Sequence, residues 1–191
     1  MRHQPFARQT VLVKDEDDSG LVQRCRAGDR RAFERLVARY QKPVFNAALR
    51  MLHNPQDALD VAQTTFLKAF EHLNDYDPSF RFYSWIYRIA VNESLNALGS
   101  RKASQGISSE EPDEAPGPDL QAEGDQTRRE IETALMGISP DLRAVIVLRH
   151  FMQLSYQDMA DVLQLPEKTV KSRLYSARQL LRDKLLQRGT V

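Results

Sequence analysis

Apolar residues recur at intervals of three and four along most of this chain, which is the spacing of one helix face. Glycine, proline and polar breaks separate the segments that show it, which span residues 19–28, 30–52, 54–73, 80–99, 127–138, 139–151 and 154–188. No segment shows the alternation of apolar and polar residues that predicts a strand between turns. The pattern therefore predicts an all-α protein.

Residues that favour helix ends support these boundaries. Asn54 is a suitable N-cap and is followed by Pro55 at the first helical position, and Ser139 is followed in the same way by Pro140. Pro43 lies inside the second apolar segment, where its missing N–H should kink the helix. We therefore expect two well-defined helix starts and one distorted helix.

The helical pattern stops between residues 103 and 126, where proline, glycine, serine and acidic residues dominate. The stretch from Ser108 to Gln126 contains no lysine or arginine, so its carboxylates repel one another and it has little to bury. We expect a flexible acidic linker between two small helical domains. The expected organisation is a polar tail at 1–18, a first domain at 19–102, the linker at 103–126 and a second domain at 127–188.

The 191 residues have a formal net charge of +1, but the charges are unevenly distributed. Seven lysines and arginines lie between Lys168 and Arg188, against the single acid Asp183. A basic carboxyl-terminal segment that follows an acidic linker is typical of a protein that binds nucleic acid.

Other features of the composition exclude several classes of protein. Cys25 is the one cysteine, which excludes an internal disulfide and a cysteine-rich zinc site. The four histidines have no metal-ligand spacing. No apolar run approaches the roughly 18 residues of a membrane span, and the amino terminus lacks the apolar core of a signal peptide. We expect a cytoplasmic protein that needs no metal or cofactor.

The segment "LSYQDMADVLQLPEKTVKSRLYSARQLL", which starts at Leu154, predicts a short helix, a tight break and a longer helix. Ser155 is a good N-cap for the first helix, and Val170 and Leu174 begin an apolar stripe on the second. The opposite side of the second helix is basic and rich in hydrogen-bonding groups, which suits the major groove of DNA. The DNA-binding residues expected there are Lys168, Lys171, Ser172, Arg173, Tyr175, Ser176, Arg178 and Gln179.

A solvated face of an ordinary amphipathic helix is the alternative interpretation of this segment. The cap, the short break and the one-sided basic charge agree with one another, and together they favour a helix-turn-helix that binds DNA.

Aromatic residues are concentrated in "FRFYSWIYRI", at residues 80–89. Helical spacing directs Phe82 toward a core and leaves Tyr83, Tyr87 and Arg88 on a more outward side. Core packing is the simpler interpretation of such a cluster. Outward rings beside arginine would also form a platform on which unpaired bases can stack, and the residue types alone leave both interpretations open.

Three blocks, "DALDVAQTTFLKAFEHL", "FYSWIYRIAVN" and the helix-turn-helix segment, together resemble the conserved regions of bacterial sigma factors, in the same order. The likeness is to the small two-domain group of the sigma-70 family, the extracytoplasmic-function (ECF) sigma factors. It covers nearly all of the chain from Leu21 to Gln187 except the linker. The resemblance implies a dissociable subunit of RNA polymerase that has no catalytic residues and directs promoter-specific transcription initiation.

The resemblance also implies a role for each block. The first resembles the helix that docks on the coiled coil of the polymerase's largest subunit, through Asp57, Asp60, Val61, Gln63, Thr65, Phe66 and Lys68. The aromatic segment resembles the part that opens the −10 promoter element and holds its unpaired strand, through Asn74, Phe80, Tyr83, Trp85, Tyr87, Arg88 and Asn92. The helix-turn-helix resembles the reader of the −35 element.

Further partners follow from the same resemblance. They are promoter DNA, the flap of core RNA polymerase and an anti-sigma factor that restrains the protein in a stress response, with no small-molecule substrate. The chain departs from the common family pattern at Leu59, Thr64 and Ser176. Contacts with the polymerase at the first two positions, and with a base at the third, are therefore not inferred from the family.

Two other functions are compatible with parts of the sequence. A conventional helix-turn-helix regulator would not bind core polymerase, and it would need a ligand pocket or a dimer surface in the first domain. A metal-dependent nuclease could use Asp57 and Asp60, which lie one helical turn apart. Nothing else in the sequence converges on those two acids, so solvated helix-face carboxylates are the better interpretation.

Overall fold

The structure is a computed structural model, and it describes residues 17–105 and 122–187. No strand occurs within these ranges, which confirms the all-α prediction. The first group of helices is α1 (Asp18–Arg26), α2 (Arg30–Leu52), α3 (Pro55–Glu71), the 3-10 turn η1 (Leu73–Asp75) and α4 (Phe82–Gln105). The second is α5 (Ala122–Met136), α6 (Pro140–Ile146), the π-helical turn η2 (Val147–Phe151), α7 (Tyr156–Leu163) and α8 (Glu167–Gln187).

Two of the expected helix starts have the anticipated cap. The Asn54 side chain accepts a hydrogen bond from the backbone N–H of Asp57 at 3.0 Å. Ser155 accepts one from the N–H of Asp158 at 3.1 Å, and the Asp158 carboxylate accepts one from the N–H of Ser155 at 3.2 Å, which completes a capping box. Ser139 makes no such side-chain bond before Pro140. The preset backbone angle of Pro140 therefore favours that helix start without a side-chain cap.

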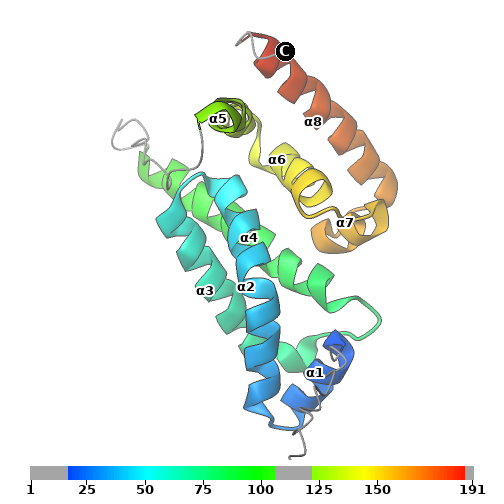
Figure 1. The fold of residues 1–191 in the computed structure, drawn as a ribbon. Coiled ribbons are helices and arrows are strands. Elements are labelled where there is room, and N and C mark those ends of the chain that lie inside the picture. The colour runs from blue at the N-terminus through cyan, green and yellow to red at the C-terminus, as the bar shows by residue number, and fades with distance from the viewer. Residues whose placement is uncertain (1–16, 106–121, 188–191) are drawn as a thin grey trace, which may run out of the picture.

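In the first domain α2, α3 and α4 pack against one another, and α1 packs on α2. Figure 1 shows α2 and α3 side by side, with α4 passing behind α2. Leu36, Met51 and Ile86 fill this core and are fully buried. Pro43 lies within α2, which continues on both sides of it.

The second domain is built on α6, α7 and α8, with α5 packed against α8. Its core contains Leu148, Met159 and Leu174, all at most 1% exposed. Helix α8 lies along the outer edge of the molecule (Figure 1), so one of its sides faces solvent over most of its length.

The two domains contact each other directly through α4 with α6 and α7, and through α2 with η2. Arg50 of α2 lies over the ring of Phe151, with the guanidinium carbon 4.3 Å from the ring centroid. Tyr83 of α4 donates a hydrogen bond from its hydroxyl to Asp158 of α7 at 2.7 Å. These contacts close the two domains on one another.

The helices extend into both ends of the expected linker. Helix α4 continues to Gln105, and α5 begins at Ala122. The middle of that linker, residues 106–121, and most of the expected tail, residues 1–16, lie outside the described residues.

The guanidinium of Arg143 holds several backbone groups at the start of the second domain. It is 4% exposed, and burial lowers its pKa to about 10. It donates to the carbonyls of Leu135, Met136 and Ile138 at 3.0, 3.0 and 3.1 Å, and to the carbonyl of Met51 in the first domain. One side chain thus donates hydrogen bonds to backbone carbonyls in the turn between α5 and α6 and to a carbonyl at the end of α2.

Replacing Arg143 with alanine should lower the free energy of unfolding by roughly 2–4 kcal/mol, because buried carbonyls would lose their charged donor. Urea denaturation followed by circular dichroism measures this change. Arg182→Ala is the matched control, since Arg182 is exposed on α8, and it should change stability by less than about 0.5 kcal/mol. Equal urea midpoints for the Arg143 and Arg182 variants would contradict the assignment.

Candidate nucleic-acid and polymerase interfaces

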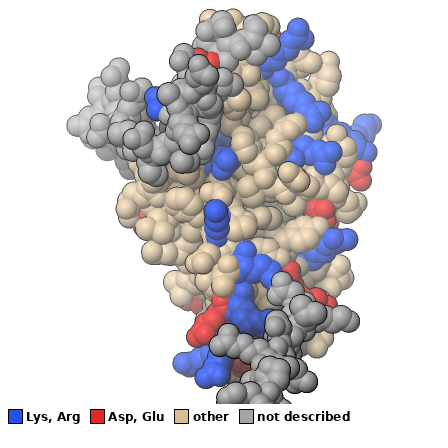
Figure 2. All heavy atoms as spheres, in the orientation of Figure 1, with Lys and Arg blue, Asp and Glu red and all other residues tan. Residues whose placement is uncertain are grey.

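Helix α8 presents its basic side to solvent. Val170, Leu174 and Ala177 are buried, as the apolar stripe predicts. Of the eight residues expected to bind DNA, Arg173 is half-buried and the others are exposed. Figure 2 shows lysine and arginine side chains along the outer side of α8. Tyr175, at 67% exposure, is the most exposed large apolar or aromatic side chain on this helix.

Several of these cations already have neighbours. Lys171 forms an ion pair with Glu167 and lies 5.2 Å from the ring centroid of Tyr156. Arg178 donates a hydrogen bond from Nε to Nε2 of His150 at 3.2 Å. Surface pairs of this kind are worth at most about 1 kcal/mol, so a phosphate could replace either partner.

Sequence reasoning did not find His150, which lies 28 residues before Arg178. It belongs to the π-helical turn η2. Burial and the charges of Arg178 and Arg149 lower the pKa of the His150 imidazole, which favours the neutral ring that can accept the bond from Arg178. No local sequence signal marks this pairing, because it depends on how α8 packs beside η2.

The residues expected to hold the −10 strand are divided between surface and core. Asn74, Phe80 and Asn92 are exposed, and Tyr83, Trp85 and Arg88 are half-buried. Tyr87 is 7% exposed, so the expectation that it points outward is wrong. The physical reason is that α4 is packed by α2 and α3 and also by α6 and α7, so its buried surface is wider than one helical stripe.

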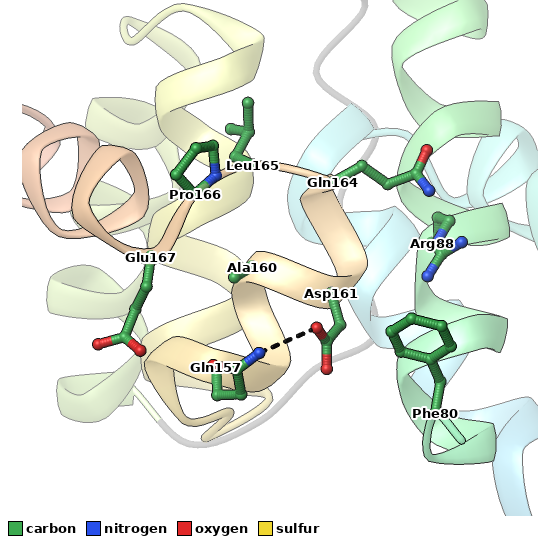
Figure 3. A pocket seen from close by; sticks show the side chains of 9 residues that line it. All are labelled: Phe80, Arg88, Gln157, Ala160, Asp161, Gln164, Leu165, Pro166 and Glu167. Atoms are coloured by element: carbon green, nitrogen blue, oxygen red, sulfur yellow. Dashed lines mark hydrogen bonds between the residues drawn. The ribbon is translucent and has the colours of Figure 1, made fainter. Parts of the chain in front are cut away.

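A groove lies between the domains at the exposed end of the aromatic segment, with a volume of about 290 Å³. Phe80 and Arg88 lie on its α4 side, and the guanidinium carbon of Arg88 is 5.6 Å from the ring centroid of Phe80. Figure 3 shows these two side chains opposite α7 and the turn that follows it. The groove is lined on that side by polar groups that include Gln157, Asp161, Gln164 and Glu167.

The residues that α3 exposes also differ from those expected from the sequence. Val61 and Thr65 are buried, and the Thr65 hydroxyl donates to the Val61 carbonyl at 2.7 Å. Their side chains therefore contribute to the core of the first domain. Asp57 pairs with Arg101, and Lys68 pairs with Glu93 at 2.7 Å. Asp60 and Gln63 are exposed, and Phe66 is half-buried.

Exposed apolar residues on α3 were missed at the sequence level. Leu59, Leu67 and Phe70 are 44%, 59% and 51% exposed. With Gln63 they follow a spacing of four, four and three, which is one face of a helix. That spacing was present in the sequence, but it could not be distinguished from a second buried stripe without the fold.

Among residues 17–105 and 122–187, no group of three or more His, Cys, Asp and Glu side chains is arranged to hold a metal ion. None of the helices in these ranges is long and apolar enough to cross a membrane.

Comparisons with known proteins match a family region to each of the two helical domains. The model of sigma-70 region 2 matches residues 36–104, and the model of sigma-70 region 4 matches residues 128–181. The RNA polymerase sigma-H factor of Pseudomonas aeruginosa is 35% identical over 92% of this chain and 97% of its own length. The ECF RNA polymerase sigma-E factor of Haemophilus influenzae is 32% identical over 91% of this chain and 98% of its own length.

Solved structures show the same fold. CnrH, in complex with the cytosolic domain of CnrY, matches with a TM-score of 0.69 and 27% identity, over 88% of this chain and 96% of that chain. RpoE of Bartonella quintana, in complex with the anti-sigma factor NepR, matches in fold with a TM-score of 0.66 and 23% identity, over 80% of this chain and 96% of that chain. With two region models in order and relatives matched over nearly their whole length, the chain belongs to the sigma-70 family, as one of its ECF sigma factors.

Proposed function

We propose that this sigma factor reads the −35 element with α8, opens the −10 element with α4 and the loop before it, and docks on core RNA polymerase with α3. The observation that carries the proposal is that one chain presents three distinct surfaces. They are the exposed basic side of α8, a group of exposed and half-buried aromatic and amide side chains on α4 and the loop before it, and the partly exposed apolar face of α3. A regulator that only binds duplex DNA would use the first of these surfaces alone.

The α8 surface has the chemistry for duplex DNA. Its exposed lysines and arginines attract phosphates, and Ser172, Gln179 and Arg178 carry hydrogen-bonding groups that can reach base edges. The buried stripe on the opposite side anchors the helix to the second domain, so these groups keep a fixed orientation relative to one another. A rigid helix of this kind can enter the major groove as a unit.

The strand-opening surface is smaller than the sequence suggested. Phe80, Tyr83, Trp85 and Arg88 supply rings and a guanidinium for stacking, and Asn74 and Asn92 supply exposed amides. Tyr87 is left out, since its side chain is in the core. Stacking on aromatic rings suits unpaired bases, because every base presents a face once it leaves the duplex.

The closed arrangement of the domains competes with this use of α4. The Tyr83 hydroxyl is bonded to Asp158, and Phe80 and Arg88 face the groove beside α7. A nucleic-acid strand on these groups would occupy the space that α7 borders. We therefore propose that α7 moves away from α4 when the promoter strand is bound.

Docking on the polymerase is assigned to the exposed face of α3. Asp60 and Gln63 provide polar contacts, and Leu59, Leu67 and Phe70 provide partly exposed apolar surface, although one edge of the Phe70 ring packs against Phe33. Exposed apolar groups at helical spacing are typical of a surface that binds another helix. The coiled coil of the polymerase's largest subunit is the partner that the proposal assigns to it.

Two further elements complete the proposal. We propose that the chain works in the cytoplasm, because a sigma factor acts where core polymerase and the chromosome are. We also propose that an anti-sigma factor restrains it by covering the α3 face, the −10 surface or both, in a stress response. The fold that the chain shares with a sigma factor solved in complex with an anti-sigma factor supports this assignment.

Permanganate footprinting tests the central proposal. Core polymerase together with this protein should make thymines of the −10 element reactive, and neither component alone should do so. The promoter can be selected by the holoenzyme from a random library. Tight binding of the isolated protein to duplex DNA as a dimer, without strand opening, would instead support the conventional regulator.

The double variant Lys171→Ala, Arg178→Ala should weaken binding to a −35 duplex. Loss of a base contact by Arg178 costs about 1–3 kcal/mol, and each lost phosphate contact lowers the salt slope by about 1. Fluorescence anisotropy at several salt concentrations measures both quantities. The pair Arg31→Ala, Lys42→Ala removes the same charge from exposed positions on α2 and should leave binding nearly unchanged. If both pairs weaken binding equally, the α8 assignment fails.

Variants of Tyr83 separate the contribution of its ring to strand binding from the contribution of its hydroxyl. Tyr83→Phe removes the bond to Asp158 and keeps the ring, so the isolated protein should bind a single-stranded −10 oligonucleotide at least as tightly as the native chain. Tyr83→Ala should cost about 1–3 kcal/mol through lost stacking. Tyr87→Phe, a hydroxyl deletion in the core of the same helix, serves as the control. Native affinity of the alanine variant would show that the ring is outside the strand site.

A further inference from the structure

Helix α1 lies before the region that matches sigma-70 region 2, which begins at residue 36. Its last residue, Arg26, nevertheless reaches the segment that joins α3 to α4, 47 residues later in the chain. That segment, residues 72–81, carries Asn74 and Phe80 of the proposed strand-opening surface. The first helix therefore touches the part of the protein that is proposed to melt DNA.

One guanidinium makes all of these contacts. Nε and Nη2 of Arg26 donate to the carbonyl of Leu73 at 3.2 and 2.9 Å, and Nη2 also donates to the carbonyl of Asn74 at 3.2 Å and to that of Tyr76. The guanidinium carbon lies 5.8 Å from the ring centroid of Tyr76. Arg26 thus fixes three backbone carbonyls and one ring of the same short turn.

Tyr76 connects the backbone groups that Arg26 holds to the aromatic segment. It is 4% exposed, and its hydroxyl donates to the carbonyl of Phe80 at 2.5 Å. Its ring centroid lies 5.3 Å from that of Trp85 and 5.7 Å from that of Phe82. The backbone of Phe80 and the ring of Trp85 are therefore each one contact away from a residue that Arg26 holds.

Most other contacts of the segment are local, such as the bond from the Ser79 N–H to the Asp77 carboxylate at 2.8 Å and the pairing of His72 with Asp75 at 3.0 Å. Between residues 71 and 81, only Leu73 and Tyr76 are buried, and the other side chains are exposed. A 3-10 turn followed by exposed loop residues has weak intrinsic stability. Donors from another helix can keep such a loop in one conformation, and a binding loop that is already ordered loses less entropy when it binds.

We propose that Arg26 is a positioning residue for promoter opening: it holds the 72–81 loop so that Asn74, Phe80 and Trp85 meet the unpaired −10 strand in a fixed geometry. This inference rests on the proposed function of that loop. Arginine suits the task because its planar fork carries five donors, whereas lysine has one compact ammonium group. Lysine at this position can reach fewer of the three carbonyls at once.

The test must separate positioning from simple stabilisation of the fold. Two premelted promoters are compared, one with the preferred −10 strand and one with a single substituted base. The quantity measured is the ratio of the holoenzyme's affinity for the first to its affinity for the second. A fall in the folded fraction lowers both affinities together and leaves the ratio unchanged. A displaced loop lowers the ratio itself, since base discrimination depends on geometry.

Arg26→Ala should reduce this ratio by about tenfold, the scale of one lost base contact, while affinity for a −35 duplex stays native. Arg26→Lys should give an intermediate ratio. Arg24→Ala is the matched control, because Arg24 lies on the same helix and its guanidinium binds Asp29, at 2.5 Å, in the turn that follows. It should leave the ratio unchanged.

The possible failures are distinguishable. If the native holoenzyme discriminates between the two promoters and the Arg26→Ala holoenzyme gives the same affinity ratio, Arg26 has no positioning role. That outcome would leave the proposed function intact. If the native holoenzyme itself neither discriminates nor opens the −10 element, the proposed function fails, and the inference about Arg26 fails with it.

Discussion

Helix α4 is packed on two sides at once, by α2 and α3 of its own domain and by α6 and α7 of the other. Its buried residues consequently include Ser84, Tyr87 and Ser94 in addition to the apolar stripe that contains Ile86. The hydroxyl of Ser94 avoids an unsatisfied buried group by donating to the carbonyl of Ala90 at 2.8 Å. The position of this one helix decides which aromatic residues remain available for DNA.

The two domains share one cluster of buried apolar side chains, and a small number of polar and cation–π contacts also cross between them. Tyr83 contributes one hydrogen bond to Asp158, and Arg50 contributes a cation–π contact to Phe151. Of the carbonyls bound by Arg143, three belong to its own domain and only that of Met51 lies across the boundary. Such contacts are individually worth about 0.5–2 kcal/mol. The proposed movement of α7 away from α4 requires that contacts with promoter DNA and polymerase replace these contacts.

The same exchange applies to the basic side of α8. Glu167 accompanies Lys171, and His150 accompanies Arg178, so neither cation is isolated in the free protein. Both pairs are at the surface, where the net energy of such contacts is small. Phosphates of a duplex can take the place of Glu167 because they offer negative charge at several positions along the helix, and release of counterions from DNA favours the exchange.

The sequence by itself determined the class of fold, the helix-turn-helix with the exposed basic side of its second helix, and the membership of a family. These depend on local periodicity, caps such as Asn54 and Ser155, and the order of motifs, all of which are written along the chain. The tertiary structure alone decided that Tyr87, Val61 and Thr65 are buried, that Leu67 and Phe70 are exposed, and that Arg26 and His150 support distant residues. Burial on a second helix face and contacts between residues far apart in sequence arise only when whole helices pack together, so no local pattern could specify them.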